Sequence, residues 1–109
     1  LQDNTEGESN TANGLSALRH NTTGIENTAV GSAALLLNTI GLQNTAVGVG
    51  ALLSNTSGSN NTAIGFNANV SSGTFTNATA LGSNAFVNAS NKVRIGDSLV
   101  TVIEGQVPF

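Results

Sequence analysis

A unit of 17 residues recurs along this chain and limits its fold more than any other feature. The pentapeptide Asn-Thr-Ala-Val-Gly at residues 27–31 returns at 44–48 and, with Ile for Val, at 61–65, and weaker copies stand at 10–14 and 78–82. A second column, Asn-Thr-x-Gly, starts at residues 4, 21, 38 and 55 and keeps the same spacing. Self-similarity at a fixed period indicates an architecture in which each unit packs on its neighbours.

The 17-residue unit is too short for a pair of helices and lacks the periodicity of one long helix. Its Thr-Ala-Val run suits a short strand, and the glycines that follow suit tight turns. We therefore predict an all-β solenoid in which equivalent residues stack at about the 4.8 Å strand spacing. The repetitive part is predicted to span residues 1–96, and a β-forming segment at 97–109 is predicted to end it.

Composition excludes several partners. The chain has 109 residues, enough for one small domain, of which 8% are charged and 39% hydrophobic, with a net charge of −3. Only three basic residues are present, which argues against a nucleic-acid partner or an acidic membrane surface. No apolar run reaches the length of a membrane span, so we expect no membrane insertion by this segment. Any export signal is expected outside this chain.

The strand pattern predicts two apolar surfaces. Successive strand residues point to opposite faces, so Thr28 and Val30 should share one face and Ala29 the other. We expect each coil interior to receive a Val or Ile, an Ala and a Leu. So narrow a coil buries little apolar area, and the apolar residues left over predict an obligate oligomer. The columns assigned to the core or to the interface between chains contain Val30, Val47, Ile64, Leu81, Leu18, Leu35 and Leu52.

Groups suited to catalysis are few. His20 is the only histidine, and a hydroxyl nucleophile needs a base within reach. Asp3, Glu6 and Glu8 could meet at one edge and hold a hard cation, but no calcium-binding repeat accompanies them, which favours surface charge. We predict a protein that is not an enzyme and that uses no cofactor or metal. Lys92 and Arg94 are predicted to have a structural role in the last coil.

The Asn-Thr-Ala-Val-Gly units, each followed by an Ala-Leu pair and an Asn-Thr-x-Gly corner, resemble the head repeats of trimeric autotransporter adhesins of the YadA type over residues 4–96. The resemblance implies a homotrimer of left-handed parallel β-rolls, although the 17-residue period departs from the usual shorter coil. Residues 91–107 are similar to the segment that precedes a self-cleaving chaperone domain in phage tail fibres. An extracellular, cell-surface or phage-particle location is therefore expected, with Phe109 as a mature C-terminus.

Because Leu1 aligns with Leu18, we expect the chain to begin in the middle of a coil, as a piece of a longer product or as a unit that abuts another.

Two functions remain open at this stage. The first is an extracellular structural or adhesive module whose partners are its own copies, as a trimer and as an end-to-end filament, and a host or matrix protein. The resemblance places the ligand-facing ladder at Asn27, Thr28, Asn44, Thr45, Asn61 and Thr62. The alternative is an ice-binding solenoid that presents the ladder Thr11, Thr28, Thr45, Thr62 and Thr79. Against the alternative, the Thr column shares its face with Val residues that we expect to be buried.

Overall fold

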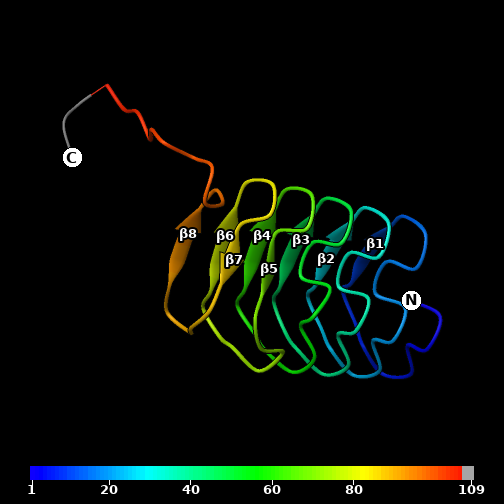
Figure 1. Ribbon diagram of the computed structural model, residues 1–109. Coiled ribbons are helices and arrows are strands. Elements are labelled where there is room, and N and C mark those ends of the chain that lie inside the picture. Colours follow the sequence, from blue (N-terminus) through cyan, green and yellow to red (C-terminus); the bar gives the residue numbers. More distant parts are fainter. Residues whose placement is uncertain (107–109) are drawn as a thin grey trace.

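A computed structural model describes residues 1–106 and shows a parallel β-solenoid with no helix in that range. The coils stack side by side along one axis, with the N-terminus at one end and an extended tail leaving the other (Figure 1). The predicted all-β solenoid with coils of 17 residues is confirmed. No helix among these residues is long and apolar enough to cross a membrane.

One column of strands forms a six-stranded parallel sheet in the order β1-β2-β3-β4-β6-β8. Each strand pairs with the strand one repeat later, so that Thr28 stands opposite Thr45, which in turn stands opposite Thr62. The last step is shorter, because Thr79 pairs with Val93, as the 14-residue spacing of the final glycines predicts. The strands are β1 (Thr11–Asn13), β2 (Thr28–Val30), β3 (Thr45–Val47), β4 (Thr62–Ile64), β6 (Thr79–Leu81) and β8 (Val93–Ile95).

A second, two-stranded sheet appears where the repeat degrades. It pairs β5 (Asn69–Val70) with β7 (Phe86–Val87). In earlier coils the same stretch is a turn, in which Leu35 and its equivalents adopt a φ of about 50° and point inward. Asn69 and Phe86 replace those leucines in the later coils, and Val70 and Val87 fill the interior instead.

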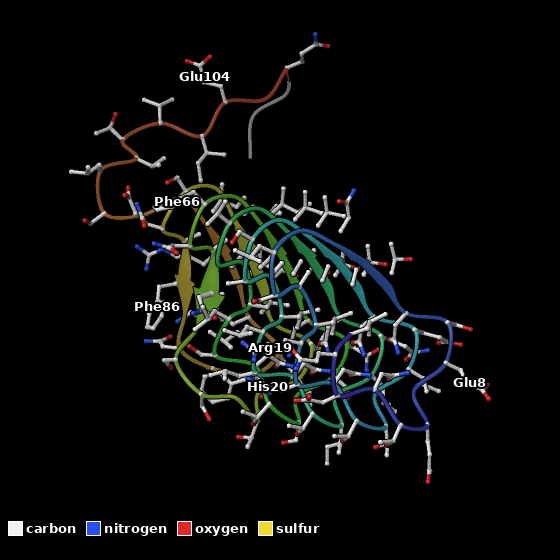
Figure 2. All side chains as sticks on the ribbon, turned by 90° about the vertical axis from the view of Figure 1, so that its right-hand side faces the viewer. Glu8, Arg19, His20, Phe66, Phe86 and Glu104 are labelled. Atoms are coloured by element: carbon white, nitrogen blue, oxygen red, sulfur yellow. The ribbon has the colours of Figure 1, made fainter. Side chains whose placement is uncertain are left out.

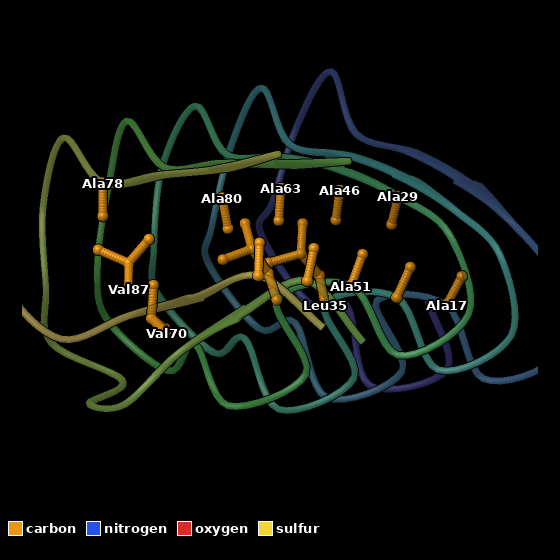
Figure 3. Close-up of a cluster of buried hydrophobic side chains, with 14 of the residues drawn as sticks. Ala17, Ala29, Leu35, Ala46, Ala51, Ala63, Val70, Ala78, Ala80 and Val87 are labelled. Atoms are coloured by element: carbon orange, nitrogen blue, oxygen red, sulfur yellow. The ribbon is translucent and has the colours of Figure 1, made fainter. Parts of the chain in front are cut away.

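The core is a narrow stack of small side chains. Ala29, Ala46, Ala63 and Ala80 form one column, at most 1% exposed, that faces the Ala and Leu residues of the opposite wall (Figure 3). Leu18, Leu35 and Leu52 are fully buried, as expected.

The expectation that the interior also receives Val or Ile is wrong for the single chain. Val30, Val47 and Ile64 point outward and are 36%, 38% and 45% exposed, and Leu81 is half-buried. Alternation along the strand allows only one of the two neighbouring columns inside. The narrow interior takes the Ala column, because Ala fits opposite the inward-pointing Leu side chains where a larger residue would overpack the core.

The glycine after each Thr-Ala-Val strand is required by close approach of the coils. Gly31 has a φ of 131°, and a Cβ atom added there would lie 2.5 Å from the carbonyl oxygen of Gly48 in the next coil. The left-handed φ and the backbone contact both exclude a side chain. The equivalent glycines repeat the geometry, so this column fixes the stacking distance at the corner.

The tail after Gly96 does not form the predicted terminating strand. Residues 97–106 contain no strand and lie almost wholly exposed, with Leu99 at 83%. A β-forming sequence becomes a strand only beside a partner strand, and residues 1–106 provide none along the tail. The last part of the predicted segment, residues 107–109, lies outside the described residues.

Candidate functional site

The single histidine belongs to a surface pair. His20 Nδ1 lies 2.7 Å from Asp3 Oδ2 in the neighbouring coil, and both side chains are more than 40% exposed. His20 and Arg19 lie at the end of the solenoid that faces the viewer in Figure 2. Asp3, Glu6 and Glu8 are exposed, and residues 1–106 contain no group of three or more acidic or histidine side chains that could hold a metal ion. The described residues therefore present charge at a corner, without a catalytic or metal-binding arrangement.

The asparagines of the predicted ligand-facing ladder are internal, which corrects their assignment. Asn27, Asn44 and Asn61 are fully buried. The side-chain amide of Asn44 donates to Asn27 Oδ1 at 3.0 Å and to the Gly58 carbonyl at 2.8 Å. Buried amides must be paired in this way, because an unpaired one costs about 1–3 kcal/mol. These residues hold neighbouring coils together and cannot meet a ligand.

A second buried ladder lies at the other corner. Asn21, Asn38 and Asn55 are also fully buried, and each donates to the Oδ1 atom of the asparagine one coil earlier. The sequence places these residues at turns, and turn asparagines are commonly exposed. Their strict 17-residue column was the available signal for a buried role.

The threonines of the predicted ladder occupy an outward face together with the valines. Thr28, Thr45 and Thr62 are half-buried, and Val30, Val47 and Ile64 stand two residues further along the same strands. In-register pairing makes each column a straight ridge along the solenoid axis. This outward surface, hereafter the Thr/Val face, is regular and free of charge.

Further apolar side chains lie outside the core. They form additional columns around the coil, and Phe66 and Phe86 project from the later coils (Figure 2). No Asp, Glu, Lys, Arg or His occurs anywhere from residue 27 to residue 91. A surface with no charge and many exposed apolar groups is typical of an interface. These exposed residues include Ile25, Leu37, Ile40, Leu42, Val49, Phe66 and Phe86.

The two basic residues of the last coil make local hydrogen bonds. Arg94 Nε donates to the Gly96 carbonyl at 3.0 Å, and Lys92 Nζ donates to Asn88 Oδ1 at 2.8 Å. Arg94 stands opposite Ala80 in the strand register, so it occupies the position that Ala fills in every earlier coil. A polar side chain therefore closes the interior column at this end.

Comparison with protein-family models, curated proteins and solved structures finds no match to this chain. The structure defines its class as a repeat protein with a parallel β-solenoid fold.

Proposed function

We propose that this chain is one subunit of a homotrimer of left-handed β-rolls that serves as an extracellular structural or adhesive fibre segment and is not an enzyme. In this proposal the Thr/Val face of each subunit turns toward the common axis. The location is outside the cell, on a cell surface or on a phage particle. The family resemblance of the Asn-Thr-Ala-Val-Gly units supports the trimer and the location.

The observation that carries the proposal is the exposed apolar ridge of Val30, Val47 and Ile64. Its side chains recur at the strand spacing, about 4.8 Å, and only a surface with the same axial period can match it over several coils. An identical chain has that period. A charge-free surface on both sides avoids the cost of burying an unpaired charge.

The composition of the core adds a second argument. The interior of a single chain consists largely of Ala side chains, and each Ala contributes little hydrophobic free energy when it is buried. Ordering the backbone of a coil costs about 1–2 kcal/mol per residue. Burial of the outward Val and Ile side chains between subunits supplies apolar area that the interior lacks.

A ligand of the adhesive module would meet outward residues only. The buried asparagines are excluded, and Thr28, Thr45 and Thr62 remain accessible only as far as the trimer leaves them uncovered. We place a host or matrix partner on exposed columns away from the axis, such as that of Phe66 and Val49.

The mass of the protein in solution tests the trimer. Light scattering coupled to size exclusion is expected to give three times the 10.9 kDa chain mass, with the β-type circular dichroism of the solenoid. A folded species with the mass of one chain would overturn the proposal.

Ice binding is a second candidate function, because the structure exposes the Thr/Val face of the single chain. The argument against it was the expected burial of Val30 and Val47 within the coil, which the structure does not show. Thr11 to Thr79 form a straight column in register on that face. Thermal hysteresis at micromolar protein would support this function, and its absence would remove it.

A further inference from the structure

The two ends of the solenoid differ in their chemistry. In the middle coils the inward column consists of Ala29, Ala46, Ala63 and Ala80, each covered by a coil on either side. At the C-terminal end the column finishes with Arg94, and at the N-terminal end it finishes with Ala12, which is only partly buried. Repeat proteins need a polar surface on their terminal units to prevent further stacking. The structure has such a surface at one end only.

The C-terminal end is closed to a further coil. A coil stacked beyond β8 would place its inward Ala against the guanidinium of Arg94 and bury a charge without an anionic partner. Lys92 adds a second cation to the same coil. The hydrogen bond from Arg94 Nε to the Gly96 carbonyl keeps the guanidinium beside the place where the chain leaves the solenoid.

The N-terminal end has an open pocket of about 380 Å³. Its lining includes Leu1, Ala12, Leu15 and Ala17, which are apolar, and Leu15 is 80% exposed. The floor is thus the same Ala and Leu surface that each coil elsewhere presents to its neighbour.

Three backbone amides at this end have no hydrogen-bond partner within residues 1–106: those of Ser9, Gly14 and Ser16. One coil later, the equivalent amides of Glu26, Gly31 and Ala33 donate to the carbonyls of Glu8, Asn13 and Leu15.

The asparagine ladder stops in the same way. Asn21 donates to both Gly24 and Asn4, whereas Asn4 donates to Gly7 alone among the described residues. Every missing acceptor lies on the outer side of the first coil.

We propose that the N-terminal end of the solenoid is an axial docking surface for one further coil of the Asn-Thr-Ala type, added in parallel register so that its inward Ala lies on Ala12. Its carbonyls accept hydrogen bonds from Ser9, Gly14 and Ser16, and its Ala and Leu side chains cover the pocket. The existing coil–coil contact continues unchanged across the new joint.

The proposal concerns this end of the fold and does not depend on the trimer. The C-terminal end of a second copy does not fit the site, because it would bring Arg94 onto Ala12. A small ligand fits less well than a coil, because the unmet amides are spread along the whole first coil and match its repeat.

An added coil tests the proposal directly. A copy of residues 35–51 placed before Leu1 makes Leu1 follow an Ala, as Leu52 follows Ala51. The matched control carries Ala46→Arg within the copy and so reproduces the polar closure of the C-terminal end. Hydrogen exchange of the labelled full chain is followed by NMR, and solution mass is measured for both proteins.

With the unmodified copy, exchange at Ser9, Gly14 and Ser16 is expected to slow by about tenfold or more relative to the original chain, because the amides become hydrogen-bonded. The control is expected to leave exchange near its original rate. Unchanged exchange with the unmodified copy would overturn the proposal, and so would equal slowing in the control, because coverage would then be non-specific. A fusion that slows exchange without any change in the number of chains separates this result from the trimer.

Discussion

Asn38 donates its side-chain amide to Asn21 Oδ1 at 2.9 Å in the preceding coil and to the Gly41 carbonyl at 3.1 Å in its own turn. Asn55 in turn donates to Asn38 Oδ1 at 2.8 Å. One buried side chain thus links three coils and one turn. Polar ladders inside the solenoid do work that large apolar side chains do in wider cores, because an amide pairs with its own copy at the strand spacing.

Replacement of Asn38 by Ala is expected to destabilise the protein by about 3 kcal/mol, because partners in two neighbouring coils and one turn lose their hydrogen bonds in a dry interior. Urea unfolding measures the effect. Asn13→Ala is the control, because Asn13 is exposed. Equal losses for the two variants would contradict the ladder.

Gly31→Ala is expected to prevent folding or to cost several kcal/mol. A methyl group at this position meets the Gly48 carbonyl at 2.5 Å and must adopt a φ of 131°. Gly105→Ala, in the exposed tail, should leave the thermal unfolding temperature unchanged. Circular dichroism melts of the two variants make the comparison, and a native-like melt of Gly31→Ala would show that the coils can separate at this corner.

Val47→Asp is expected to abolish the trimer, since it would bury an unpaired carboxylate among the Val columns of three chains. Light scattering reports the mass. Ser57→Asp introduces the same charge at an exposed turn and should keep the three-chain mass. If Val47→Asp also keeps that mass, the Thr/Val face does not lie at the axis.

Ala33→Asn is expected to stabilise the chain by about 0.5 kcal/mol. Ala33 adopts a φ of 60°, and the same column carries Asn67 and Asn84 at 54° and 57°. Asn tolerates the left-handed region better than Ala. The control is Ala89→Asn, at a half-buried position whose φ is not in that region, and it should give no gain. Chemical denaturation of both variants decides the point.

The stacking of the chain could be predicted from the sequence, because strand register follows from the repeat. The pairing of Thr28 with Thr45, the 14-residue step to Val93 and the burial of Leu35 all agree with the periodicity. A column repeated at a constant spacing leaves one arrangement that stacks equal residues, so the period determines the partners of each strand.

The candidate surface could not be predicted in the same way. The pattern Thr-Ala-Val states that Ala29 and Val30 point in opposite directions and leaves open which of them is inside. The ligand-facing role of Asn44 failed for a related reason, because an exposed turn asparagine and a buried ladder asparagine have the same sequence.

The period of 17 residues by itself determined that the chain winds into a parallel solenoid and which residues stand above one another. Only the tertiary structure decided which columns face inward, that Arg94 closes one end and that the tail finds no partner strand. The reason is that register is a property of spacing along the chain, whereas burial depends on how much volume the opposite wall of the coil leaves free.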